Sequence, residues 1–116
     1  MSAFAQEQNA AYVSAPLSSV FVAEWRGGMN VYFKQLTPNE LSIVKAITGE
    51  NDSEYAMNLV ILKALDENKE RLFENKDADV LRHWPAQFVF NDIAVKMQSR
   101  ATLKETKDFS STTQTN

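Results

Sequence analysis

The chain has 116 residues, a length that suits one domain, and its 44% apolar and 23% charged residues are close to a globular average. This composition excludes a wholly disordered chain, and 3 Gly with 3 Pro exclude collagen-like and Pro/Gly-rich classes. The net charge of −3 does not favour nucleic-acid binding, and 0 Cys exclude disulfides and thiolate metal sites.

The N-terminal segment is small and polar. Residues 1–11 contain Phe4 as the only large apolar residue before position 12, apart from the initial Met1, so we predict a flexible arm. The segment has neither a basic start nor a long apolar stretch, and we expect no signal peptide. No apolar run approaches the ~20 residues that a membrane-spanning helix needs, so we expect no membrane partner.

Two runs rich in β-branched and aromatic residues follow, Ser19–Trp25 and Val31–Leu36. Between them lie two adjacent glycines, Gly27 and Gly28, which supply the positive φ that a tight turn needs. We predict an antiparallel hairpin in which Val31 and Phe33 share the core face.

A helix start comes directly after the hairpin. Thr37 is placed as the N-cap, Pro38 as the first helical residue and Glu40 as the third, which is a capping box with the favoured proline. Gly49 ends the helix. Its predicted apolar stripe is Leu41, Ile43, Val44 and Ile47.

A second helix is predicted over Glu54–Leu65, capped by Asp52 or Ser53. It is apolar on most sides, as expected of the central core helix of a small domain. A brief helix over Lys76–Arg82 and a last helix over about 85–101 follow, the latter with Val89 or Phe90, Ile93 and Met97 inside.

These elements predict a mainly helical α+β fold with an N-terminal antiparallel hairpin. We place one globular domain at 12–103 and a disordered polar tail at 104–116, because the tail cannot offset its ordering entropy by burial.

Acidic residues are concentrated in the middle of the chain. Residues 50–79 hold nine acids and four bases, a net charge of −5, whereas the remainder carries +2. This distribution is compatible with a solvated rim around buried helices or with a docking face for a basic partner.

No motif supports catalysis, so we expect no enzyme, cofactor or metal site. His83 is the only histidine, which disfavours a zinc site. The segment from Asp66 has Arg71 where a calcium loop requires glycine. Trp25, Tyr32 and Trp84 are either core and boundary residues or interface anchors.

The order of features resembles the tail assembly chaperones of long-tailed, siphovirus-like phages and prophages. The resemblance covers roughly residues 17–100, and its strongest part is the block from Leu59 to Leu81, which contains Ala64-Leu65-Asp66-Glu67 and Leu72-Phe73. This chain departs from the pattern at Lys69 or Glu70, since a glycine often follows the acidic turn in that family.

The resemblance implies a chaperone that binds the tape measure protein, helps recruit tail tube subunits and is absent from the mature virion. It also implies that the protein acts in the host cell cytoplasm. A longer form made by translational frameshifting would contact the tube protein. We expect an apolar groove with a charged rim that includes the acidic residues Asp66, Glu67, Glu70 and Glu74.

Two other functions remain open. A small structural tail or connector component of the virion would have the same size and charge, and would also lack catalytic motifs. A small hydrolase with a carboxylate pair is the weaker alternative.

Overall fold

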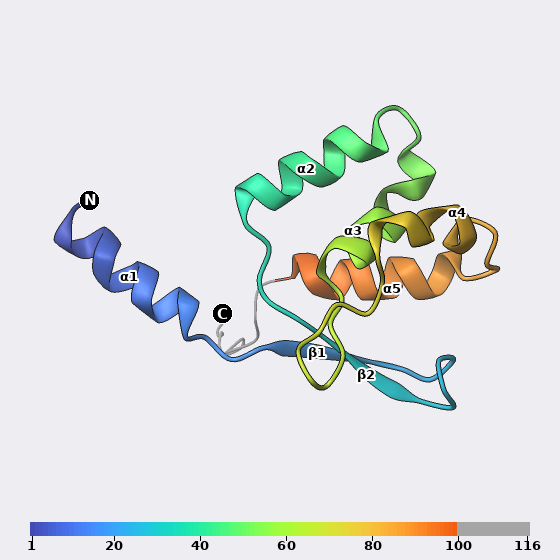
Figure 1. The fold of residues 1–116 in the computed structure, drawn as a ribbon, viewed down its shortest axis with the longest axis horizontal. Helices are drawn as coiled ribbons and strands as arrows, with labels where there is room; N and C mark the ends of the chain where they lie inside the picture. The colour runs from blue at the N-terminus through green and yellow to red at the C-terminus, as the bar shows by residue number, and fades with distance from the viewer. Residues whose placement is uncertain (100–116) are drawn as a thin grey trace, which may run out of the picture.

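Helices packed around one central helix, with a two-stranded hairpin beneath them, make up the fold (Figure 1). The computed structural model describes residues 1–99. The elements in chain order are α1 (Ala3–Val13), β1 (Ser18–Val22), β2 (Met29–Phe33), α2 (Pro38–Thr48), the 3-10 turn η1 (Asp52–Glu54), α3 (Tyr55–Lys63), the 3-10 turn η2 (Asn75–Asp77), α4 (Ala78–Leu81) and α5 (Gln87–Gln98). This is the mainly helical α+β fold predicted from the sequence.

The hairpin forms as predicted, with Val20 opposite Val31 in an antiparallel ladder. Val31 and Phe33 are buried on its core face. The first strand ends earlier than predicted, at Val22, because the chain turns sharply between Trp25 and Gly28. The second strand runs from Met29 to Phe33, so it begins two residues earlier and ends three residues earlier than predicted. Gly27 and Gly28 have the expected positive φ, 71° and 120°.

The capping box of α2 is present with both of its hydrogen bonds. The N–H of Glu40 donates to the Thr37 hydroxyl at 3.1 Å, and the N–H of Thr37 donates to the Glu40 carboxylate at 3.0 Å. Gly49 ends the helix at φ 59°. These local signals were sufficient to predict both helix ends.

The predicted inner face of α2 is partly wrong. Val44 and Thr48 are buried, whereas Ile43 is 39% and Ile47 63% exposed. The helix is rotated so that the Thr48 hydroxyl accepts a hydrogen bond from the buried Asn58 amide of α3 at 3.1 Å. A polar pair therefore occupies the contact where an apolar stripe was expected.

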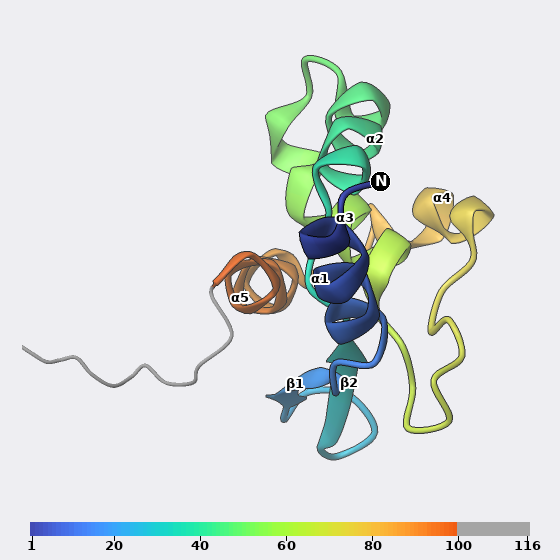
Figure 2. The ribbon, with the colours of Figure 1, turned by 90° about the vertical axis from the view of Figure 1, so that its left-hand side faces the viewer.

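Helix α3 is the central core helix, as predicted. All six residues from Ala56 to Ile61 are buried, and the helix packs against α2, α4 and α5 (Figures 1 and 2). Its N-terminus differs from the prediction, because η1 precedes it and neither Asp52 nor Ser53 caps it through a side chain. It ends at Lys63, two residues before the predicted Leu65.

The last helices follow the predicted order with shifted bounds. The short helical segment predicted over 76–82 is the 3-10 turn η2 followed by α4. Helix α5 begins at Gln87 and buries Phe90, Ile93 and Met97, the inner stripe that the sequence predicted. The helix ends at Gln98, before the predicted 101, because the backbone of Ser99 is extended.

The N-terminal segment is helical and not a loose arm. Ser2 caps α1 by accepting a hydrogen bond from the N–H of Ala5 at 3.0 Å, and alanine and glutamine, good helix formers, dominate its sequence. None of its residues is buried, and the helix projects away from the packed elements (Figure 1). The packed part thus starts at β1, while the predicted tail at 104–116 lies outside the described residues.

Candidate functional site

The acidic turn, defined here as residues 66–70, is held in shape by its own hydrogen bonds. The Asp66 carboxylate accepts hydrogen bonds from the N–H groups of Asn68 at 2.8 Å and Glu70 at 3.0 Å. The N–H of Lys69 donates to the Asp66 carbonyl at 2.9 Å. The carboxylate of Asp66 therefore shapes the turn and is already engaged by the backbone.

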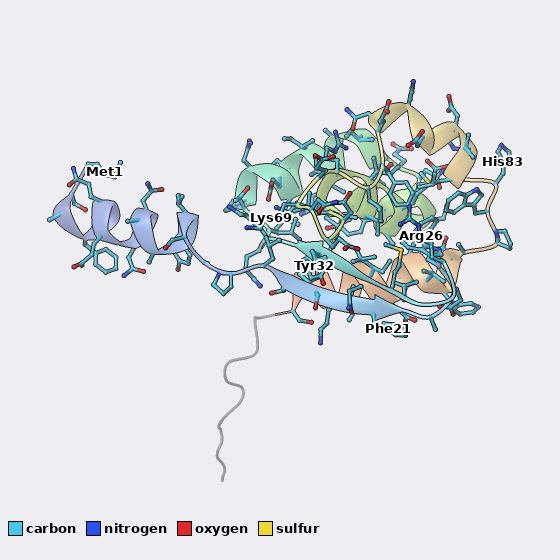
Figure 3. All side chains as sticks on the ribbon, turned by 60° about the horizontal axis from the view of Figure 1, so that its bottom comes forward. Met1, Phe21, Arg26, Tyr32, Lys69 and His83 are labelled. Carbon is cyan, nitrogen blue, oxygen red and sulfur yellow. The ribbon has the colours of Figure 1, made fainter. Side chains whose placement is uncertain are left out.

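The turn is fixed to the hairpin at its base. Leu65 exchanges two backbone hydrogen bonds with Tyr32 of β2, at 2.8 and 2.9 Å, and so continues the sheet by one rung. The N–H of Leu72 closes the segment by donating to the Ala64 carbonyl at 2.9 Å. Figure 3 labels Tyr32 and Lys69, which mark the two sides of this junction.

Lys69 has φ 68°, the left-handed conformation that favours glycine. We therefore expect Lys69→Gly to raise the free energy of unfolding by about 0.5–1 kcal/mol, because it removes the strain of a Cβ at this φ. Urea unfolding measures the change. Lys45→Gly in the exposed face of α2 is the control and is expected to lower stability by about 1 kcal/mol; a loss of stability in Lys69→Gly would contradict the strained turn.

The structure brings the four predicted rim residues into two neighbouring groups. Asp66 belongs to the turn framework, while Glu67 and Glu70 are exposed on the same turn. Glu74 is the residue directly before η2 and is also exposed. Its carboxylate lies 3.5 Å from the Lys76 ammonium. Three of the four carboxylates are thus exposed, although Glu74 pairs with Lys76, whereas Asp66 is engaged by the turn.

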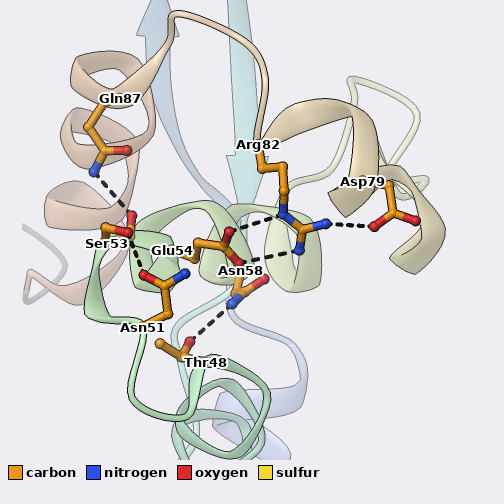
Figure 4. Close-up of polar contacts among 8 residues, drawn as sticks. All are labelled: Thr48, Asn51, Ser53, Glu54, Asn58, Asp79, Arg82 and Gln87. Atoms are coloured by element: carbon orange, nitrogen blue, oxygen red, sulfur yellow. Dashed lines mark hydrogen bonds and ion pairs between the residues drawn. The ribbon is translucent and has the colours of Figure 1, made fainter.

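A second polar cluster, absent from the sequence prediction, joins α4 to η1 (Figure 4). The Arg82 guanidinium donates to both Glu54 oxygens, at 3.0 and 3.3 Å, and to Asp79 at 2.6 Å. Hydrogen bonding to Glu54, and then to Asp79, raises the pKa of Arg82 above its ordinary value. The three-residue spacing of Asp79 and Arg82 could have predicted their ion pair on a helix. The pairing with Glu54 could not be predicted in this way, because Glu54 is 28 positions away in the chain.

Beside this cluster lies a small pocket of about 110 Å³. Its walls come from η1, α3, α4, α5 and the segment that joins the last two. The lining residues are Ser53, Glu54, Met57, Leu81, Arg82, Trp84, Gln87 and Phe90. We call it the Trp84 pocket.

Four aromatic rings connect the hairpin to the helices. Trp25 meets Phe73, Trp84 and Phe90 edge-on, with ring centroids 5.8, 6.5 and 6.3 Å apart. Phe73 and Trp84 are 6.1 Å apart. Trp25 is therefore a boundary residue of the core, whereas Trp84 remains 40% exposed at the edge of the Trp84 pocket.

His83 is exposed and points away from the packed elements (Figure 3). Within residues 1–99 no three His, Cys, Asp or Glu side chains are grouped so that they could hold a metal ion. The Trp84 pocket is also well below the ~300 Å³ of an ordinary small-molecule site.

Several large apolar side chains lie exposed on the helices. Phe4, Tyr12 and Val13 on α1 are 65–72% exposed, and Phe88 on α5 is 84% exposed. With Ile47 of α2, they give the molecule apolar surface that its own core does not use. Single exposed apolar residues are common on protein surfaces, and it is their grouping into a contiguous patch that marks an interaction site.

Among the described residues, no helix combines the length and apolar character needed to cross a bilayer. In the comparisons with known proteins, no family model matches the chain, and no curated protein or solved structure shows significant similarity to it.

Proposed function

We propose that this chain is a phage tail assembly chaperone that binds the tape measure protein and helps recruit tail tube subunits. The mature virion does not contain it. It acts in the cytoplasm of the host cell, and its tube-binding activity resides in a longer, frameshifted form. The proposal rests on the resemblance of residues 17–100 and on the exposed apolar side chains of α1 and α2.

The block with the strongest resemblance, Leu59–Leu81, supports the proposal by its position. It starts and ends in the core, at two buried leucines, and between them it carries the acidic turn to the surface. Phe73 anchors it in the middle through edge-on contacts with Trp25 and Trp84. The residues that carry the resemblance thus form one segment that is anchored in the core at both ends and exposed at the acidic turn.

The single observation that carries the proposal is the exposed apolar surface of α1 and α2. Helix α1 buries none of its residues, and Phe4 and Tyr12 are 70% and 72% exposed. Covering the apolar face of a long helical partner would suppress that partner's self-association. The exposed carboxylates of Glu67, Glu70 and Glu74 would favour basic residues elsewhere on the partner.

The test is reversal of the three exposed carboxylates, Glu67→Lys/Glu70→Lys/Glu74→Lys. Asp66 is left intact because it holds the turn. We expect the variant to bind the tape measure protein of the same phage roughly tenfold more weakly, with an unchanged circular dichroism spectrum. Glu24→Lys/Asp52→Lys/Asp92→Lys makes the same change in charge at exposed positions outside α1, α2 and the acidic turn, and serves as the control. Equal binding by wild type and both variants would exclude the acidic turn as the docking rim.

Mass spectrometry of purified particles separates the chaperone from a structural tail or connector component. A chaperone is missing from the particles although it is abundant in the infected cell. Its presence at stoichiometric amounts would favour the structural component.

A further inference from the structure

We infer that the free edge of β1 pairs with β1 of a second copy of this chain, so that two hairpins join into one antiparallel sheet. The sheet has the order β1–β2, and Leu65 continues it on the far side of β2. Strand β1 is therefore the open edge, and within residues 1–99 its ladder partner is β2. The acidic turn joins the sheet beyond β2, so pairing at β1 is independent of the proposed function.

The hydrogen bonds of β2 show which backbone groups of β1 are free. Tyr32 exchanges both of its backbone hydrogen bonds with Leu65, so its N–H and C=O point away from β1. Tyr32 is paired with Ser19, and alternate residues of an antiparallel ladder face the partner strand. The N–H and C=O groups of Ser19 and Phe21 consequently point outward from the sheet, while those of Val20 face β2.

The edge lacks the features with which proteins protect an open strand. Such strands usually carry a charged side chain, a proline or a bulge. Ser18–Val22 contains no charge and no proline, and its pairs with β2 follow one another without a bulge. Phe21, labelled in Figure 3, is 63% exposed on the outer face of the hairpin. Strand β1 is therefore ready to accept a further strand.

The distribution of charge selects a second copy as the occupant. Glu7 is the last charged residue before Glu24, so residues 8–23, which include β1, carry no charged side chain. The chain as a whole is 23% charged and has a net charge of −3. Two acidic copies repel each other except where their surfaces are uncharged, whereas a strongly charged partner finds no complementary charge at this edge. The uncharged strand is thus suited to its own copy.

A two-fold axis at Val20 provides a partner for every free backbone group of the edge. Ser19 then exchanges two backbone hydrogen bonds with the partner's Phe21, and Phe21 does the same with the partner's Ser19. Val20, half-buried against the core, lies opposite the partner's Val20. The two Phe21 rings become diagonal neighbours, at a spacing that aromatic side chains can bridge. Because each copy contributes the same strand, the assembly closes as a dimer.

The test is sedimentation equilibrium of the full chain from micromolar to millimolar concentrations, where we expect a reversible monomer–dimer equilibrium. Ser19→Pro removes an outward N–H and leaves the hydrogen bonds between β1 and β2 in place, so it should weaken the dimer at least about tenfold with an unchanged circular dichroism spectrum. Ser19→Thr keeps the N–H and should dimerise as the wild type does. A wild-type chain that stays monomeric, or a folded Ser19→Pro variant that dimerises equally well, would refute the inference.

A cysteine at the two-fold axis tests the register. The chain has 0 Cys, so Val20→Cys introduces a single thiol. Opposite residues at a non-hydrogen-bonded antiparallel position have Cα atoms about 4.5 Å apart, close enough for a disulfide. We expect mild oxidation to form a covalent dimer at least about fivefold faster than in Val95→Cys, a position 65% exposed on α5. Equal rates for the two variants would show random collision and would overturn the β1–β1 pairing.

Discussion

Leu59→Ala is expected to lower the free energy of unfolding by about 2–5 kcal/mol, the largest loss from any single truncation considered for this chain. Leu59 is 0% exposed at the centre of α3, the helix that α2, α4 and α5 all contact. Removing its side chain leaves a cavity that three separate helices would have to close. Chemical unfolding monitored by circular dichroism measures the loss.

Ile47→Ala is the matched control, because it also truncates a four-carbon aliphatic side chain. Ile47 is 63% exposed on α2, although its spacing predicted a core position. We expect it to lower stability by less than about 0.5 kcal/mol, as surface substitutions do. A loss comparable to that of Leu59→Ala would show that α2 is rotated relative to the arrangement described above.

Glu40→Ala is expected to lower the free energy of unfolding by about 2–3 kcal/mol, since it removes two interactions together. The Glu40 carboxylate completes the capping box and accepts both short contacts from the Lys63 ammonium, at 2.9 and 3.0 Å. The Lys63 side chain is only 10% exposed, so the substitution leaves a nearly buried cation without its partner. The pair links the first turn of α2 to the last residue of α3.

The double variant Glu40→Ala/Lys63→Met is the control for this pair. Methionine keeps the apolar volume and removes the buried charge, so we expect the double variant to recover more than half of the loss. The same urea titrations measure both proteins. A double variant as unstable as Glu40→Ala would show that the lost cap, and not the unpaired ammonium, causes the damage.

The Glu40–Lys63 pair also makes stability depend on pH. Burial alone raises the pKa of Glu40, but hydrogen bonds from Lys63 and Thr37 and the charge of Lys63 outweigh it, so the pKa lies below its ordinary 4.5. The folded state therefore binds fewer protons than the unfolded chain. The stabilisation is complete above pH 4.5 and is lost as the pH falls through the lowered pKa. In Glu40→Gln this part of the acid loss should be absent.

The features that the sequence predicted well are set by residues close together in the chain. Thr37, Pro38 and Glu40 define a helix start within four positions, and adjacent glycines define the hairpin turn. Both depend on local hydrogen bonds and local φ values. The alternation in β2 likewise identified Val31 and Phe33 as core residues.

Of the features that were missed, the orientation of α2 depends on contacts between distant residues, whereas α1 depends on local signals that were not recognised. The orientation of α2 places Thr48 against the buried Asn58 of α3, a polar contact that apolar periodicity does not indicate. Helix α1 has good helix formers and a serine cap, but its sequence has no apolar stripe that would indicate packing against a core. Helix propensity and the Ser2 cap are the interactions that favour α1 as a helix.

The candidate site divides in the same way. The acidic turn was predicted from its composition, and the structure adds that Asp66 serves the turn while Glu67, Glu70 and Glu74 are exposed. The Trp84 pocket was missed because its walls come from residues 53–90, brought together only by the packing of α4 and α5. Trp84 was one of three aromatics considered as anchors, and nothing in the sequence indicated which one lies beside a cavity.

The most direct test of the proposed chaperone function is the solubility of the tape measure protein of the same phage, produced with and without this chain. The soluble fraction, measured after centrifugation and by light scattering, should rise several-fold when the wild-type chain is present. It should rise much less with Glu67→Lys/Glu70→Lys/Glu74→Lys. A tape measure protein that aggregates equally with and without the wild-type chain would contradict the proposal.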